Sequence, residues 1–193
     1  MPKITLRRFC DDDLEPVRLW RNSPEISSSM YGAHTITEAE HRTWFTSLKV
    51  DNTKSYWIIE SDGRAVGVSY IYDIDSKNRH ASWGFYIVDD RSRRTGAGYY
   101  VEVFMLHFAF EHLKLNKLSC EVLAKNNAVW RLHEKIGFRR EGLFLSHISK
   151  AGKYHDVVRL GLLQREWLSI KQKHVDRLVA RGQQLPNFCQ LEK

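Results

Sequence analysis

The sequence predicts an α/β (α+β) fold, in which a mixed sheet carries helices on both faces and a further helix follows at the C-terminal end. Alternating apolar segments joined by short turns fill the middle of the chain, and later strand patterns alternate with helical ones. Hairpins produce antiparallel strand pairs, whereas crossover helices produce parallel ones, so one sheet should contain both. The expected order is β-α-α-β-β-β-α-β-α-β-β-α.

The N-terminal part predicts one strand and two helices. Residues 4–9 alternate in polarity and indicate a strand, and the acidic residues and proline at 12–16 are typical of a helix start. Ser-Pro and a run of serines end this helix in a loop over residues 23–35. The Thr37-Glu-Ala-Glu40 sequence is a capping box that opens a second helix running to residue 48.

The remaining elements follow from alternation, turn signals and glycines. Residues 56–60 and 65–72 form two strands around the hairpin turn Ser61-Asp62-Gly63. Gly137 ends the later of two further helices. The other predicted elements are strand 80–88, helix 99–113, strand 117–122, helix 126–135, strands 141–148 and 155–163, and amphipathic helix 164–179.

Composition limits the classes of partner. The 193-residue chain fits one domain, and its formal net charge of +7 predicts an anionic partner, either nucleic acid or a small polyphosphate. The basic residues are scattered and do not form a duplex-binding stripe, so we expect no nucleic-acid partner. Cys10, Cys120 and Cys189 are far apart and lack a Cys-x-x-Cys pair, which argues against a disulfide framework or a metal site.

No segment predicts export or membrane insertion. The N-terminus lacks the apolar region of a signal peptide, and the longest apolar block, residues 103–110, is too short to span a bilayer. We therefore expect a cytoplasmic protein without a membrane partner.

The most informative segment is Arg91-Ser-Arg-Arg-Thr-Gly-Ala-Gly98, which lies between a predicted strand and a predicted helix. Its glycines allow the backbone to approach an anion, and a helix N-terminus favours negative charge. The segment is therefore a candidate phosphate cradle, although a plain strand–helix turn would have the same local pattern. It lacks the third glycine of a Rossmann fingerprint and the Gly-Lys-Ser/Thr of a Walker A loop.

Two motifs together resemble the GNAT superfamily of N-acetyltransferases. The first is Arg93-x-x-Gly96-x-Gly98 after a strand, and the second is Asn126-Asn-Ala-Val-Trp-Arg-Leu-His-Glu-Lys-Ile-Gly-Phe138. The resemblance covers about residues 4–163. It implies a mostly antiparallel sheet of about seven strands, an N-acetyltransferase domain over residues 1–163, and a C-terminal helical extension of that domain over residues 164–193.

The same resemblance implies that acetyl-CoA enters between the strand ending at Val88 and the strand starting at Lys117. Backbone at Tyr86, Ile87 and Val88 would pair with the pantetheine arm and polarise the thioester carbonyl. Asn126 would bind near the pantetheine. The pyrophosphate would be held by the loop residues Arg93, Arg94, Thr95, Gly96, Ala97, Gly98 and Tyr99.

Acetyl transfer to an amine needs a route for the amine proton and an acid for the departing thiolate. His133 is the candidate acid at a position where many superfamily members carry tyrosine, although it could instead be a packed histidine without a chemical role. Glu121 could receive the amine proton, or it could be a simple ion-paired strand carboxylate. Tyr86 is the alternative acid. Neither Cys10 nor Cys120 shows an evident nucleophile pattern, so a direct ternary mechanism is expected.

Acceptor information lies in the first third of the chain, where aromatic residues mix with Arg and His. Rings can stack on a base, and a guanidinium can pair with a diphosphate. Each of these residues also has a plain alternative, because Trp44 and Trp57 could be core residues and Arg21 a solvated helix-end cation. The candidate substrate-binding residues are Arg21, Met30, Tyr31, His41, Trp44, Trp57 and Tyr86.

The chain carries Trp20-Arg-Asn22, Met30-Tyr31 and His41, followed by Gly84-Phe85-Tyr86 and Leu132-His-Glu-Lys135. In this pattern it resembles the UDP-4-amino-4,6-dideoxy-sugar N-acetyltransferases of the pseudaminic acid pathway, which serves flagellin glycosylation. The resemblance implies a nucleotide-sugar substrate. Acetylation of a protein N-terminus or another small amine remains the alternative within the fold, and a non-catalytic basic binding module is the alternative outside it. The C-terminal helix could pack on the domain or form a homodimer seam.

Overall fold

The computed structural model describes residues 1–32 and 34–186, so Cys189 lies outside the described residues. The strands are β1 (Ile4–Arg8), β2 (Ser55–Ser61), β3 (Arg64–Asp75), β4 (His80–Ile87), β5 (Lys117–Leu123), β6 (Arg139–Lys150) and β7 (Lys153–Leu163). The helices are α1 (Leu14–Asn22), α2 (Pro24–Ser27), α3 (Glu38–Leu48), α4 (Asp90–Arg94), α5 (Ala97–His107), α6 (Asn127–Ile136) and α7 (Gln164–Val179). A 3-10 turn (Asp11–Asp13) precedes α1, and a π-helical turn (Phe108–His112) continues α5.

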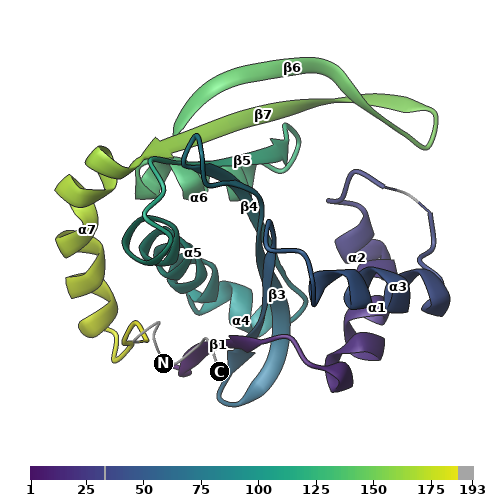
Figure 1. The fold of residues 1–193 in the computed structure, drawn as a ribbon, viewed down its shortest axis with the longest axis horizontal. Coiled ribbons are helices and arrows are strands. Elements are labelled where there is room, and N and C mark those ends of the chain that lie inside the picture. Colours follow the sequence, from purple (N-terminus) through teal and green to yellow (C-terminus); the bar gives the residue numbers. More distant parts are fainter. Residues whose placement is uncertain (33, 187–193) are drawn as a thin grey trace.

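The described strands form a seven-stranded sheet in the order β1-β2-β3-β4-β5-β7-β6. The β4–β5 pair is parallel and the other five pairs are antiparallel. Helices α4 to α7 lie on one side of the sheet and α1 to α3 on the other (Figure 1). The predicted mixed, mostly antiparallel sheet with helices on both faces is confirmed.

Two predicted loops contain short helices. Ser23 caps α2 by accepting the N–H of Ile26 at 3.4 Å, and the carboxylate of Asp89 caps α4 by accepting the N–H of Ser92 at 2.8 Å. A side-chain acceptor at these positions satisfies a backbone donor that a single turn of helix leaves free. The segment predicted as a phosphate loop, residues 91–98, is therefore partly helical.

The core lies mainly between the sheet and α5. Most of α5 is buried, and its side chains pack against the central strands. A smaller cluster that includes Val17 and Ile26 lies on the opposite face, under α1 and α2. Burial of apolar area on both faces fixes the register of β4, because a shift by one residue would exchange its two faces.

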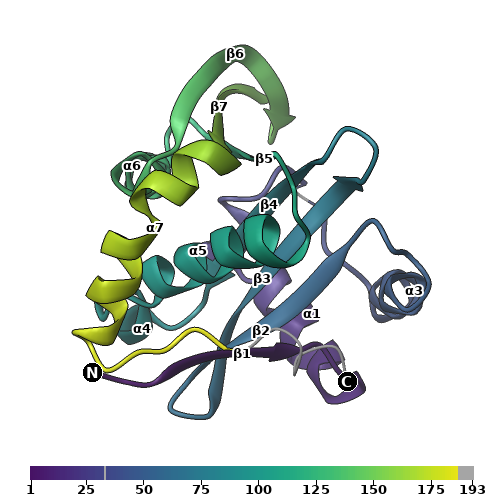
Figure 2. The same cartoon turned by 60° about the vertical axis from the view of Figure 1, so that its left-hand side comes forward.

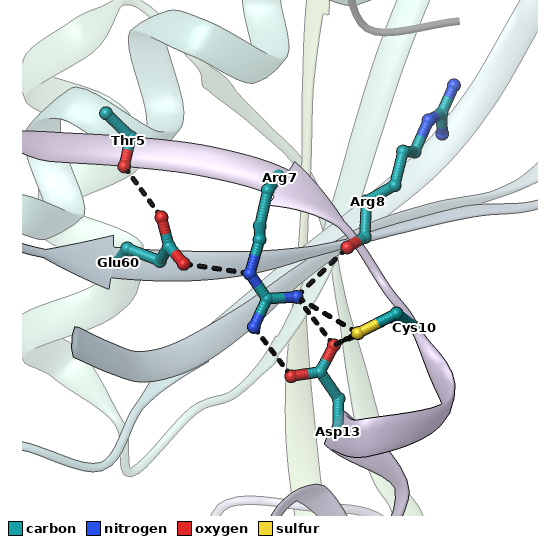
Figure 3. A network of polar contacts seen from close by, with 6 residues as sticks. All are labelled: Thr5, Arg7, Arg8, Cys10, Asp13 and Glu60. Atoms are coloured by element: carbon teal, nitrogen blue, oxygen red, sulfur yellow. Dashed lines mark hydrogen bonds and ion pairs between the residues drawn. The ribbon is translucent and has the colours of Figure 1, made fainter. Parts of the chain in front are cut away.

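A polar network joins β1 to the start of α1 (Figure 3). The Arg7 guanidinium donates to both carboxylate oxygens of Asp13, at 2.6 and 2.8 Å, and its Nε donates to Glu60 on β2 at 2.8 Å. Thr5 also donates to Glu60, and the backbone N–H of Cys10 donates to Asp13. Burial and the contact with Asp13 raise the pKa of the Cys10 thiol, so it is a poor nucleophile.

The parallel β4–β5 pair extends only from His80–Lys117 to Ser82–Ser119. Beyond these residues β4 continues to Ile87 and β5 to Leu123 without pairing to each other. One edge of each strand is therefore available to a ligand in the middle of the sheet.

The segment after α7 returns to the N-terminal strand (Figure 2). The side-chain Oε1 of Gln183 accepts the backbone N–H of Ile4 at 3.0 Å, and its Nε2 donates to the backbone carbonyl of Pro2. The Tyr100 hydroxyl donates to the carbonyl of Gln184 at 2.9 Å. The described C-terminal residues are thus packed onto the domain.

No helix in the described ranges combines the length and the apolar character that crossing a membrane requires.

Candidate active site

A cavity of about 580 Å³ lies between the diverging ends of β4 and β5. Leu132 and His133 of α6 line it from the α5 side of the sheet, whereas Met30 and Tyr31 line it from the side of α1 and α2. The cavity therefore connects the two faces of the sheet. Two ligands could meet there from opposite sides.

The N-terminus of α5 opens towards this cavity. Its N-cap is Gly96, which adopts a left-handed conformation with φ of +90° and offers no side-chain cap. The backbone N–H of Tyr100 donates to the carbonyl of Gly96 as the first helical hydrogen bond, which leaves the N–H groups of Ala97, Gly98 and Tyr99 without helical acceptors. Gly98 itself lines the cavity. Such a helix end suits a phosphate.

The predicted cofactor residues around this loop have different environments. Arg93 braces the end of β4, because its Nε donates to the Ile87 carbonyl at 2.6 Å and its Nη1 contacts Asp90 and Glu25. The Val88 N–H already donates to the Val66 carbonyl at 2.8 Å, and the pairing of backbone at Tyr86–Val88 with the pantetheine stays a prediction. Ile87, Arg93 and Asn126 line the cavity, and Arg94 is exposed.

Two arginines from the C-terminal region lie beside the same helix end. The Arg177 and Arg181 guanidiniums lie 4.9 and 5.8 Å from the centre of the Tyr99 ring. Arg181 Nη1 would be 3.0 Å from a Cβ atom placed on Gly96. Within residues 1–32 and 34–186, neither guanidinium forms an ion pair. Sequence reasoning missed this pair, although two arginines one turn apart at the end of an amphipathic helix were a signal.

His133 is buried on the inner side of α6, where it is 2% exposed. Its Nδ1 lies 2.7 Å from Glu102 Oε1, and its ring packs on Trp83 and Phe138. Burial lowers the pKa of the imidazole, but the negative charge of Glu102 and contacts with Cys120 outweigh it and raise the pKa well above 6.5. His133 can therefore hold a proton at neutral pH while facing the cavity.

Cys120 on β5 also lines the cavity and lies close enough to His133 to help raise the pKa of its imidazole. This proximity could not be predicted from the sequence, because the two residues lie on different elements. A thiol beside a histidine that contacts a carboxylate resembles the arrangement of an activated nucleophile. Cys120 is therefore a further candidate for a chemical role beside His133.

Glu121 points to the opposite face of β5, where both of its carboxylate oxygens are occupied. Arg159 Nη1 donates to Oε1 at 2.8 Å, and the Tyr31 hydroxyl donates to Oε2 at 2.9 Å. Burial and the bond to Glu121 raise the pKa of the Tyr31 phenol, so the tyrosine remains neutral and a donor. The Tyr31–Glu121 contact links the loop after α2 to β5 across the cavity.

Tyrosine rings form the wall below α1. Tyr56 stacks on Tyr70 at 5.3 Å, and Tyr70 and Tyr86 both line the cavity. Burial raises the pKa of the Tyr86 phenol, whose hydroxyl is buried without a hydrogen-bond partner among the described residues. This phenol lies in the cluster under α1, whereas His133 packs on the other side of the sheet. A role for the Tyr86 side chain as an alternative acid is not supported.

Arg21 of α1 is half-buried and forms no ion pair within the described ranges. Arg21 does not line the cavity, but Tyr70 and Tyr86 do. Burial raises the pKa of both phenols, and the positive charge of Arg21 opposes this rise only in part. An unpaired guanidinium behind neutral tyrosines makes this side of the cavity favourable to an anion.

Four of the predicted acceptor residues lie outside the cavity lining: Arg21, described above, and Trp57, His41 and Trp44. Trp57 is fully buried, with its ring 4.8 Å from that of Phe108, so its predicted substrate contact is wrong. His41 and Trp44 stack on each other at 4.9 Å, and Trp44 packs on Tyr56. They support the tyrosine wall from behind and do not face the cavity. Isolated aromatic residues in a sequence do not reveal which face of the sheet they occupy.

The amino-acid sequence over residues 3–139 matches the family model of the acetyltransferase (GNAT) domain. The chain belongs to the GNAT family. A SPbeta prophage-derived N-acetyltransferase of Bacillus subtilis, YokL, is 31% identical over 167 residues, which cover 85% of this chain and 92% of the relative. The acetyltransferase PseH of Campylobacter jejuni is 28% identical over 138 residues, covering 70% of this chain and 84% of the relative.

Spermidine N-acetyltransferase from Vibrio cholerae, solved with CoA and spermine, shares the GNAT fold with a TM-score of 0.81 at 23% identity, covering 86% of this chain and 98% of that one. A further structure of that enzyme is dodecameric. This GNAT protein is thus an acetyl-CoA-dependent N-acetyltransferase. Relatives named for different activities match the chain at similarly low sequence identity, so family membership alone does not identify the acceptor.

Proposed function

We propose that the protein transfers acetyl from acetyl-CoA to the 4-amino group of a UDP-linked 4-amino-4,6-dideoxy-sugar by direct attack in a ternary complex. The observation that carries this proposal is the tyrosine-lined half of the cavity with the unpaired Arg21 behind it. Aromatic rings suit a uracil base, and an unpaired guanidinium suits a diphosphate. The resemblance of the residue pattern around Arg21, Met30 and Tyr31 to sugar-nucleotide acetyltransferases supports the same acceptor.

A polyamine acceptor fits this half of the cavity less well. Binding of a polycation needs free carboxylates, but Glu25 is paired with Arg93 and Glu121 is paired with Arg159. Lys150 adds a further cation, since its Nζ donates to the carbonyls of Ser27 and Met30 beside the cavity. A protein N-terminus remains the alternative acceptor within the fold.

For acetyl-CoA, the proposal assigns the pyrophosphate to the free N–H groups at the start of α5, with Arg94 nearby. Asn126 and the free edge of β4 would bind the pantetheine arm. Arg177 and Arg181 would add positive charge to the same end, so the described part of the C-terminal extension, residues 164–186, would contribute to the cofactor site. Acetyl-CoA is an anion, so these unpaired charges favour its binding.

In the proposed reaction, the neutral amine attacks the thioester carbonyl and the carbon–sulfur bond breaks. Glu121 would take the amine proton after release of the Tyr31 hydroxyl, directly or through water. His133 would give a proton to the CoA thiolate. The cavity joins these two residues from opposite faces of the sheet, in keeping with transfer between two ligands.

The acceptor is tested by CoA thiol release. We expect release with a UDP-4-amino-4,6-dideoxy-sugar and competitive inhibition by free UDP. Arg21→Ala should weaken UDP inhibition roughly two- to tenfold, as expected for one charge-assisted contact, while the KM for acetyl-CoA stays unchanged. Arg42→Ala is the control, because Arg42 lies on the surface of α3 and pairs with Glu38.

Thiol release with a peptide amine together with no effect of UDP would refute the sugar acceptor and leave the family assignment intact.

The contribution of the C-terminal arginines is tested by the double variant Arg177→Ala/Arg181→Ala. We expect the KM for acetyl-CoA to rise roughly two- to fivefold for partly exposed charges, with the largest effect at low salt. Arg165→Ala is the control, since Arg165 is exposed at the opposite end of α7. Equal KM values for the double variant and the control would remove α7 from the cofactor site.

Two further expectations remain predictions. A cytoplasmic location follows only from the sequence pattern.

The expected homodimer could bury Leu143 and Leu145 on the edge strand β6, which are 54% and 72% exposed. Light scattering of the purified protein would measure its mass in solution.

A further inference from the structure

A buried carboxylate lies directly behind the candidate acid. Glu102 belongs to α5 and is 0% exposed, yet its neighbours along the helix are core side chains. Its Oε1 lies 2.7 Å from His133 Nδ1, and its Oε2 has no hydrogen-bond partner among the described residues. Placing a glutamate in an apolar core is costly unless a partner compensates. His133 is the one residue in the described part of the chain to which it is hydrogen-bonded.

The contact between Glu102 and His133 also fixes which nitrogen of the imidazole faces the cavity. Because Nδ1 is bound to Glu102, Nε2 is the nitrogen left for Cys120 and the cavity. Trp83 and Phe138 pack on the ring at 5.3 and 5.5 Å and restrict its rotation. Glu102 of α5, Trp83 of β4 and Phe138 together set the orientation of the imidazole.

We propose that Glu102 is a positioning residue that keeps His133 protonated and directs its Nε2–H to the sulfur atom of the departing CoA. This inference rests on the proposed function, in which His133 is the acid. It adds a residue that does not touch either substrate, and it explains how a histidine can serve where a phenol, with its much higher pKa, would be the ordinary donor.

The proton balance of the step is simple. The carbon–sulfur bond breaks and its electron pair goes to the CoA sulfur, which takes the Nε2 proton. His133 becomes neutral, and Glu102 retains its hydrogen bond to Nδ1. The proton released by the attacking amine leaves through Glu121 or water, and solvent later returns a proton to His133.

The charge environment of His133 predicts the pH dependence. The titratable groups that face it are Glu102 from α5 and Cys120 from β5, whereas β4 and residue 138 contribute aromatic side chains. Burial raises the pKa of Glu102, and the charge of Glu102 raises that of His133, so the pair holds a proton to higher pH than free imidazole. An acid must be protonated to act, so turnover should persist above pH 6.5 and fall as pH rises through the pKa of His133.

The experiment compares pH profiles of kcat for the wild type, Glu102→Gln and Glu102→Asp. Glutamine keeps an oxygen that can accept from Nδ1–H but removes the charge, so the alkaline fall in kcat should move to lower pH. Aspartate keeps the charge, so the profile should return towards that of the wild type with a lower maximum. Glu111→Gln is the control, because Glu111 follows α5 but pairs with Lys171 outside the cavity.

A second readout is independent of turnover. NMR titration of His133 in the wild type should give a pKa above 6.5, and Glu102→Gln should lower it. An unmoved pH profile together with a wild-type His133 pKa of 6.5 or lower would overturn the inference. Intact turnover in His133→Phe would also overturn the inference, because His133 would then not be the acid. The proposed acceptor fails separately, if thiol is released with a peptide amine and not with the UDP-sugar while the pH profile still shifts in Glu102→Gln.

Discussion

His133→Phe should reduce kcat about 10²- to 10³-fold, within the range that general acid catalysis contributes, with little change in the KM for acetyl-CoA. Phenylalanine fills the same space against Trp83 and Phe138 but has no proton to donate. Steady-state kinetics with thiol detection give both constants. His147→Phe is a suitable control, since His147 is exposed on β6.

Retained turnover in His133→Phe would move the acid role to another residue near the cavity. Cys120 is then the first candidate, because it lines the cavity beside His133. Direct transfer predicts that Cys120→Ala remains active. An acetylated Cys120, detected by mass spectrometry after incubation with acetyl-CoA alone, would instead favour a covalent route.

Gly67→Ala is expected to be the most destabilising of the substitutions discussed. A Cβ atom on Gly67 would lie 2.2 Å from the Tyr86 carbonyl oxygen and 2.9 Å from the Ile87 Cα. The contact is with backbone, so no side-chain rotation can relieve it, and β3 and β4 must separate. We expect a loss of about 3 kcal/mol or more of unfolding free energy, which corresponds to a fall in Tm of roughly 6–12 °C for a chain of this size.

The same substitution should raise the KM for acetyl-CoA in the folded fraction, because Tyr86 and Ile87 border the cavity. Gly142→Ala is the matched control. A Cβ there would meet only the Phe144 ring at 3.7 Å, which is an ordinary contact. Thermal unfolding of both variants measures the difference, and a normal Tm for Gly67→Ala would contradict the argument.

The sequence predicted the parts of the site that depend on local chain geometry. The Gly96 turn, the capping box at Thr37, the helix end at Gly137 and the strand that leads into the loop all depend on a few adjacent residues. Such signals are short-range and readable without the fold.

The parts that sequence reasoning missed depend on contacts between distant segments. Glu102 lies in an apolar helix and becomes informative only because α6 brings His133 against it. Arg177 and Arg181 read as surface charges until α7 places them beside Tyr99. Trp57 was misassigned for the same reason, since a strand residue can face either side of a sheet.

The contact between Gln183 and Ile4 has a consequence for the order of folding during synthesis. These two residues are 179 positions apart, and the backbone N–H of Ile4 depends on the Gln183 side chain for a hydrogen bond that nearer residues do not supply. While the ribosome is still making α7, β1 can pair with β2 but its first N–H has no acceptor from the chain. Strand β1 is therefore secured by a residue that is made after α7, and a nascent chain stalled within α7 should expose that edge to chaperones and proteases.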